Sequence, residues 1–149
     1  MNKLTWERFF DVALWLAAAG HFVTLVASFQ VPYRLRWKQD LAQLMPFNRK
    51  LMWVQSGFTV LTILAFGILT VVLHGEMLRG DRAALGLVCY IAVFWTARML
   101  VDAFYYAHED WPKGRQFVIG HFLLTSLFVA QAGAYWGLFA WHALGRITG

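Results

Sequence analysis

Residues 51–74, LMWVQSGFTVLTILAFGILTVVLH, decide the fold of this chain, because they contain no Asp, Glu, Lys or Arg. A helix needs about 20 predominantly apolar residues to cross the hydrocarbon core of a bilayer. Working outward from this stretch, three more long apolar stretches occur, at residues 9–30, 83–106 and 117–143. Backbone groups in lipid must be hydrogen-bonded within their own segment, so all four stretches are expected to be helices.

The composition of the 149 residues supports the same interpretation. Hydrophobic residues make up 60% of the chain and charged residues 14%, against about 45–50% and about 25% in an average globular domain. The mean hydropathy is +0.53. Short connections make neighbouring helices antiparallel. We therefore expect an all-α polytopic membrane protein, with one domain over residues 1–149 built as an antiparallel four-transmembrane-helix bundle.

The connection between the first two spans is expected to hold a short amphipathic helix, at about residues 32–45, lying in the membrane interface. Trp37, Leu41 and Leu44 recur at helical spacing among polar residues, and Pro32 and Pro46 suit its beginning and its end. An ordinary polar loop is the alternative. The side chains expected at the lipid headgroups are Arg34, Arg36, Trp37, Lys38, Arg49 and Lys50.

The net charge of +5 comes mostly from basic residues that flank the apolar stretches, where they meet lipid headgroups. We therefore expect membrane lipids, and not nucleic acid, as a partner. Seven Lys or Arg lie on the side of the 31–50 and 107–116 connections, and five on the side of the termini. The positive-inside rule then predicts a cytoplasmic 31–50 connection and termini on the outer side.

Known catalytic patterns do not occur in the sequence. The single cysteine, Cys89, excludes an internal disulfide and a catalytic thiol pair. There is also no HExxH, GxSxG, Walker loop or paired-Asp phosphotransfer motif. The sequence thus favours a protein that is not an enzyme, and no metal site is expected.

Polar residues within the spans gather toward the 31–50 side. Counting inward at about 1.5 Å per residue, Gln55, Asp102 and His121 lie about 6 Å deep, and Arg98 and His21 about 12–13 Å deep. Each such residue is costly in lipid and needs a partner. On the third span the polar and aromatic residues share one stripe at helical spacing, namely Trp95, Arg98, Asp102 and Tyr105.

Two interpretations of this group stay open. In the first, Arg98 and Asp102 neutralise each other, and the other polar residues form interhelical hydrogen bonds. In the second, the group binds a quinone or another lipid-like headgroup. A b-type haem held by His21 and His121 is a narrower alternative, although their depths differ by about 7 Å. Otherwise no cofactor is expected.

Small residues at four-residue spacing let helices approach closely in a membrane. The fourth span carries such a stripe, which predicts a packing seam with another helix of this chain or of another chain. Its residues are Ser126, Ala130, Gly133 and Gly137.

The stretch PFNRKLMWVQSGFTVLTILAFG, at residues 46–67, together with FWTARML at residues 94–100, resembles a group of small four-span bacterial integral membrane proteins with no characterised activity. This resemblance implies a location in the bacterial inner membrane and adds no chemistry.

Two functional hypotheses follow. In the first, the chain is a non-enzymatic subunit or scaffold that associates with itself or with other membrane subunits. In the second, it is a redox membrane protein that binds a quinone, a lipid headgroup or haem b.

Overall fold

The computed structural model describes residues 3–106 and 114–147, and four long apolar helices dominate it. They are α1 (Lys3–Arg34), α3 (Pro46–Val72), α5 (Arg82–Phe104) and α6 (Arg115–Ile147). Each is long enough and apolar enough to cross a membrane. The prediction of an all-α bundle of four transmembrane helices is confirmed, although the helix ends differ by several residues from those expected.

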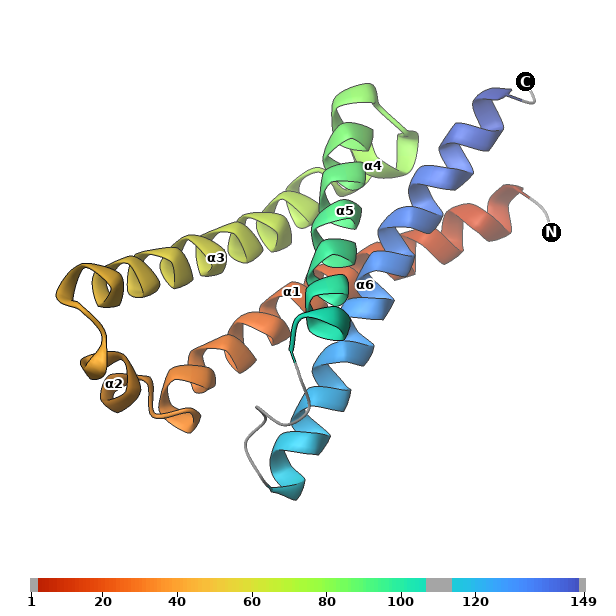
Figure 1. Ribbon diagram of the computed structural model, residues 1–149. Helices are drawn as coiled ribbons and strands as arrows, with labels where there is room; N and C mark the ends of the chain where they lie inside the picture. Colours follow the sequence, from red (N-terminus) through yellow and green to blue (C-terminus); the bar gives the residue numbers. More distant parts are fainter. Residues whose placement is uncertain (1–2, 107–113, 148–149) are drawn as a thin grey trace.

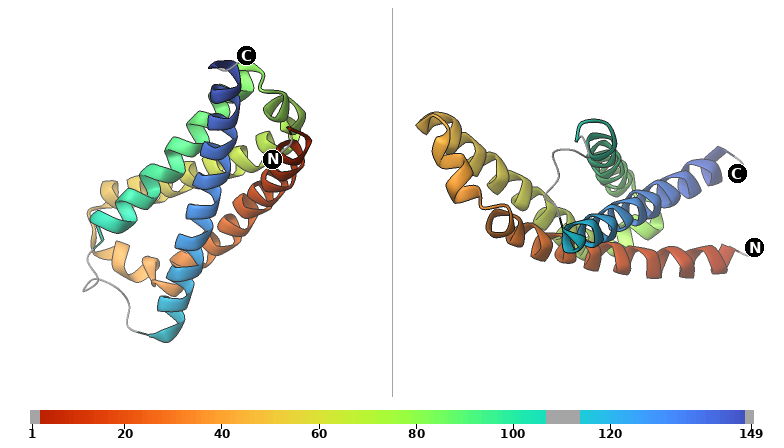
Figure 2. Two further views of the ribbon diagram at one scale, coloured as in Figure 1. Left: turned by 90° about the vertical axis from the view of Figure 1, so that its right-hand side faces the viewer. Right: turned by 60° about the horizontal axis from the view of Figure 1, so that its bottom comes forward.

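The helices form two antiparallel pairs. α1 packs along α3, α5 packs along α6, and the two pairs meet where α1 contacts α6. The beginning of α1 and the end of α6 lie at the same end of the bundle, and α3 and α5 diverge toward the opposite end (Figures 1 and 2). Before they diverge, the ring of Phe66 on α3 contacts the rings of Tyr90 and Phe94 on α5, at centroid distances of 5.7 and 5.1 Å.

A glycine sets the closest approach of α1 and α3. A Cβ atom at Gly67 would lie 3.1 Å from the ring of Phe22 and 3.2 Å from the Cβ of His21. The two backbones can meet here because Gly67 has no side chain. Around this crossing lies a continuous apolar core that draws on all four long helices, including Leu14, Ile63, Phe66, Val88, Ile91, Trp95, Phe128 and Leu138.

The connection between α1 and α3 contains a short helical segment, as expected, but with narrower bounds than residues 32–45. α1 continues to Arg34, and only the short α2 (Trp37–Asp40) and the 3-10 turn η1 (Leu41–Gln43) follow it. Pro32 lies in the last turn of α1, where its missing N–H removes a single backbone hydrogen bond and does not end the helix. The break comes at Arg36, whose φ of 51° is left-handed. Pro46 does not end a helix either, because it begins α3.

The residues expected at the lipid headgroups lie on this connection and its flanks. Arg34, Arg36, Lys38 and Lys50 are exposed, while Trp37 and Arg49 are partly buried. The ring of Trp37 contacts that of Trp53 at 5.8 Å. The 31–50 segment therefore offers basic and aromatic groups at one end of the bundle, as an interfacial segment would.

At the opposite end, the helix α4 (His74–Arg79) follows α3 after Leu73. The second span therefore ends at Val72, two residues before the expected end. Gly80, with a φ of 76°, closes α4. A Cβ atom there would lie 2.5 Å from Nδ1 of His142, so Gly80 is needed both for its backbone conformation and for the packing of α6.

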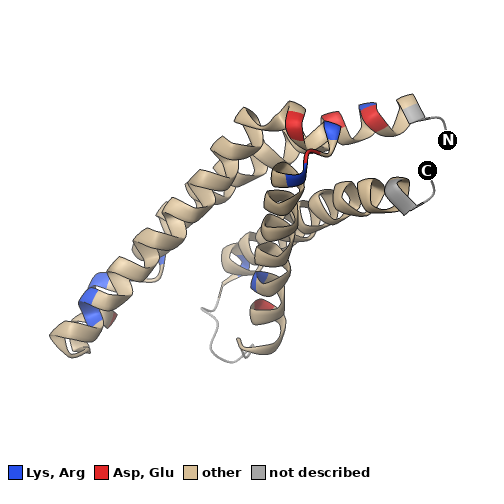
Figure 3. Cartoon of the chain, turned by 90° about the horizontal axis from the view of Figure 1, so that it is seen from above, with Lys and Arg blue, Asp and Glu red and all other residues tan. Residues whose placement is uncertain are grey.

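Most Lys, Arg, Asp and Glu residues lie toward the ends of the helices, with long uncharged stretches between them (Figure 3). This distribution matches the apolar slab of a bilayer between two polar interfaces. Lys113, one of the basic residues counted for the orientation, lies outside the described residues.

Candidate functional site

The most deeply buried polar side chains form a chain of hydrogen bonds across three helices. His21 on α1 is fully buried, and its Nε2 lies 3.0 Å from the hydroxyl of Tyr135 on α6. That hydroxyl lies 2.7 Å from Oγ1 of Thr70 on α3. Tyr135 and Thr70 are also fully buried. We call these three residues the central triad, and it links α1, α3 and α6 at their crossing.

The donors and acceptors of the central triad can be assigned. Thr70 has one hydroxyl proton, which it donates to the backbone oxygen of Phe66 at 2.7 Å. When Thr70 makes this bond, Tyr135 donates its proton to Thr70, and Nε2–H of His21 donates to the oxygen of Tyr135. His21 is thus held in the Nε2–H tautomer, and its Nδ1 is an acceptor.

Aromatic rings enclose His21. Its ring centroid lies 5.6 Å from that of Trp95 and 5.9 Å from that of Phe66, and Trp95 stacks on Phe128 at 4.9 Å. Within the described residues, neither Nδ1 of His21 nor Nε1 of Trp95 has a hydrogen-bond partner. Nδ1 of His21, a buried acceptor, and Nε1–H of Trp95, a buried donor, therefore both lie in this aromatic core.

A second polar contact lies beside the central triad. Nε2 of Gln131 on α6 donates to Oγ1 of Thr24 on α1 at 3.4 Å, and both side chains are buried. Gly20 allows this approach, since a Cβ atom there would lie 3.3 Å from Nε2 of Gln131. Polar contacts thus run along the α1–α6 interface for about one helical turn.

The predicted polar group is divided between separate places. His21 belongs to the central triad, whereas Asp102 and His121 meet between α5 and α6. Oδ2 of Asp102 accepts a hydrogen bond from Oγ1 of Thr125 at 3.1 Å and lies 3.7 Å from Nε2 of His121. The side chains of Asp102 and His121 are 10% and 33% exposed. We call Asp102, His121 and Thr125 the α5–α6 cluster.

The expected direct pair of Arg98 and Asp102 does not form. Within the described residues, no hydrogen bond or ion pair joins the two side chains, because Asp102 turns toward α6. The Cζ atom of Arg98 lies instead 5.6 Å from the ring centroid of Phe128 and 5.9 Å from that of Tyr106. Arg98 is partly buried.

Three further predicted site residues lie elsewhere. Gln55 is exposed in the first half of α3. Tyr105 follows the end of α5 and is 79% exposed, so the expected stripe on this helix stops before it. Trp95 is fully buried and contacts His21 of the central triad, not the α5–α6 cluster.

The two candidate haem ligands cannot share one iron in this arrangement. His21 contacts Tyr135, which follows His121 on α6 by about four turns, or about 21 Å along the axis. Two imidazoles that ligate the same iron place their nitrogens only about 4 Å apart, at about 2 Å from the metal each. The geometry therefore argues against a bis-histidine haem at these two residues.

The predicted seam of α6 faces outward along most of its length. Ser126, Ala130 and Gly133 are exposed, and a Cβ atom at Gly133 would meet nothing within 4 Å. Of these four residues, Gly137 packs on another helix, because its Cβ position lies 3.3 Å from the ring of Phe10 on α1. The rest of the stripe is exposed with respect to the residues that the structure describes.

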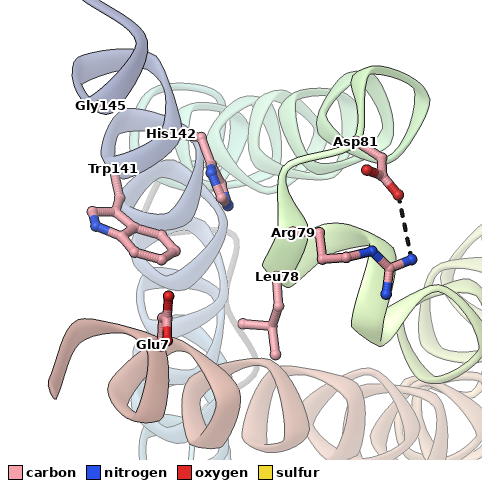
Figure 4. Close-up of a pocket in the computed structure, with 7 residues that line it drawn as sticks. All are labelled: Glu7, Leu78, Arg79, Asp81, Trp141, His142 and Gly145. Carbon is pink, nitrogen blue, oxygen red and sulfur yellow. Dashed lines mark hydrogen bonds and ion pairs between the residues drawn. The ribbon is translucent and has the colours of Figure 1, made fainter. Parts of the chain in front are cut away.

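An open pocket lies at the end of the bundle that carries α4. Figure 4 shows Glu7 from α1 and Trp141 and His142 from α6 around it, with Arg79 and Asp81 on the other side. Arg79 already bonds Asp81 at 3.4 Å and Glu76 at 3.2 Å. Arg79 and Asp81, which both line this pocket, are therefore paired with each other.

Sequence reasoning identified His21 but missed its partners, Tyr135 and Thr70. One signal was available, since Phe128, Gln131, Tyr135 and Leu138 recur at intervals of three and four residues and so lie on one face of the helix. A polar residue on such a face implies a buried partner on a neighbouring helix.

Replacing Tyr135 by Phe is expected to lower the free energy of unfolding by about 1–3 kcal/mol, because it leaves Nε2–H of His21 buried without an acceptor. Unfolding in mixed detergent micelles, followed by circular dichroism, measures the change. The control is Tyr90→Phe, because Tyr90 is exposed and no hydrogen bond of its hydroxyl is found in the described chain. Equal stability losses in the two variants would contradict the assigned hydrogen bonds.

Comparison with protein-family models, with curated proteins and with solved structures finds no match to this chain.

Proposed function

We propose that the chain is a non-enzymatic subunit or scaffold of a bacterial inner-membrane complex. The proposal rests on exposed small residues of α6 and on the exposed side-chain amide of Gln55 on α3. Within a membrane, apolar side chains do not drive helices together, so close contact depends on small residues and hydrogen bonds. The chain exposes both of these features.

The observation that carries the proposal is the exposed stripe of Ser126, Ala130 and Gly133. These positions allow a second helix to approach the backbone of α6, and within the described part of the chain no helix covers them. Gln55 adds to this on α3, where an exposed amide in the apolar slab lacks the hydrogen bonds that water or a partner would supply.

The central triad supports a structural use of the buried polar residues. Its members hydrogen-bond one another and are enclosed by rings of the core. Such bonds contribute about 0.6 kcal/mol each on average in membrane proteins, and they fix which helices pair. The subunit would thus be a rigid core with outward faces that bind a partner.

The orientation proposed for this subunit places the 31–50 connection in the cytoplasm, on the balance of seven Lys or Arg against five. A cysteine introduced at Lys38 in a Cys89→Ser background tests it. In the proposed orientation, a membrane-impermeant thiol reagent labels this cysteine only after the cells are opened. Labelling in intact cells would reverse the orientation.

The subunit role predicts that Gly133→Leu lowers the proportion of the chain found in a larger assembly, because the new side chain keeps a second helix away from α6. The Cβ position at Gly133 is open, so the single chain should keep its stability. Light scattering of protein extracted from native membranes in a mild detergent measures the mass of the assembly beside the 17.1 kDa chain.

The matched control is Gly86→Leu on α5, since a Cβ atom at Gly86 also meets nothing within 4 Å. Gly86→Leu should leave the assembly intact. A wild-type chain that is monomeric both in detergent and after crosslinking in the membrane would refute the subunit role. Equal effects of the two substitutions would show that the α6 stripe is not the contact.

A further inference from the structure

Arg98 carries a permanent positive charge within a membrane-spanning helix. It is partly buried on α5, which ends at Phe104, so its Cα lies about 9 Å from the end of the helix. This end is the one that also carries the basic 31–50 segment. A long arginine side chain at this depth can extend along the helix and place its guanidinium near the headgroups.

The hydrogen-bond donors of Arg98 have no acceptor within the described residues. A guanidinium presents five N–H donors in a planar fork, and the contacts of Arg98 are the faces of Phe128 and Tyr106. A ring face attracts a cation but does not replace the acceptors that the N–H groups lose on leaving water. Oxygen acceptors must come from elsewhere.

The nearest carboxylate on the same helix is already engaged. Oδ2 of Asp102 binds the hydroxyl of Thr125 and lies beside His121, and its side chain is 10% exposed. Asp102 thus points into the α5–α6 interface. The guanidinium group of Arg98 can therefore bind a ligand outside this interface.

We propose that Arg98 binds a phosphate group at the membrane surface, with the phosphate of an anionic lipid headgroup or free phosphate as its source. A phosphate offers two oxygens to the guanidinium fork in a bidentate, charge-assisted pair. The aromatic rings beside Arg98 would hold the fork in place. The exposed basic residues at this end, among them Arg34, Lys38 and Lys50, would raise the local concentration of anionic lipid.

Lipid binding to the purified full-length chain in a neutral detergent tests this site. The probes are phosphatidylglycerol and diacylglycerol with the same acyl chains, of which only the first has a phosphate. Native mass spectrometry measures the ratio of the two bound lipids. Wild type should prefer phosphatidylglycerol, and Arg98→Gln should lower this preference about fivefold, as expected for one basic group near an anionic surface.

Two further variants separate the site from general effects. Arg98→Lys keeps the charge and should retain a preference between those of wild type and Arg98→Gln, which guards against a loss caused by misfolding. Lys38→Gln removes one positive charge at the same end, outside the site, and should lower the ratio by a smaller factor than Arg98→Gln does. Equal losses in Arg98→Gln and Lys38→Gln would overturn the proposal, as would a wild type that binds both lipids equally.

An excess of inorganic phosphate distinguishes the two sources. Displacement of bound phosphatidylglycerol from wild type, but not of the residual lipid from Arg98→Gln, would assign the site to phosphate itself. Retention of the lipid would assign it to a membrane lipid. Because these measurements use the single chain in detergent, their outcome is independent of whether the chain joins a larger assembly.

Discussion

Trp95→Ala is expected to lower the free energy of unfolding by about 3–5 kcal/mol, the largest effect of any single substitution considered for this chain. Trp95 is fully buried, stacks on Phe128 at 4.9 Å and contacts Phe94 at 5.3 Å. Removing the indole leaves a cavity between α1, α5 and α6, and the rings that line it lose their dispersion contacts. These contacts matter more in lipid than in water, because helix association there depends on packing.

The same substitution at Trp136 is the control. Trp136 is 38% exposed and has one hydrogen bond within the described residues, from its Nε1 to Oγ1 of Thr96 at 3.0 Å. Trp136→Ala should lower the free energy of unfolding less than Trp95→Ala does, because more than a third of this side chain is already exposed. Circular dichroism during unfolding in mixed micelles compares the two variants. A loss at Trp95 no larger than at Trp136 would mean that the core is not centred on Trp95.

Gly67→Leu is expected to be the next most damaging change, at about 1–3 kcal/mol or more, because it overpacks the crossing of α1 and α3. A Cβ atom alone would lie 3.1 Å from the ring of Phe22 and 3.2 Å from the Cβ of His21. The remaining atoms of a leucine side chain can fit only if the two helices separate. Their separation would also pull His21 and Thr70 away from Tyr135.

Gly57→Leu on the same helix provides the comparison, since a Cβ atom at Gly57 would meet nothing within 4 Å. Both substitutions replace a helical glycine by leucine, which has a higher helix propensity. The stability gained from helix propensity is therefore similar in the two variants and cancels in the comparison. The difference in their unfolding midpoints therefore isolates the cost of the crossing. Equal stability of the Gly67→Leu and Gly57→Leu variants would contradict the close approach of α1 and α3 at Gly67.

The four spans could be predicted because length and hydropathy alone decide them. A stretch such as residues 51–74, without a single charge, has no stable place except a bilayer or a large core. The helix ends were less predictable. Pro32 and Pro46 are compatible with either end of a helix, and the backbone of Arg36, not a proline, sets the break.

The partners of the polar residues could not be read from depth along the spans. Depth along the spans placed five polar residues in one half of the bilayer, namely His21, Gln55, Arg98, Asp102 and His121. Depth does not fix the rotation of each helix or the angle at which two helices cross. Gln55 is exposed on α3 and so stands apart from the buried polar residues. His21 pairs with the hydroxyl of Tyr135. The aromatic ring of Tyr135 is typical of an apolar helix, so the sequence did not single this residue out as polar.

The hydrogen bond between α1 and α6 has a consequence for biosynthesis. Ribosomes deliver a chain from its N-terminus, so α1 and α3 enter the bilayer while Tyr135 is still to be made. Until α6 arrives, Nε2 of His21 lacks the acceptor that it has in the finished protein. The nascent chain must therefore shield a polar imidazole for as long as translation of the segment between His21 and Tyr135 takes.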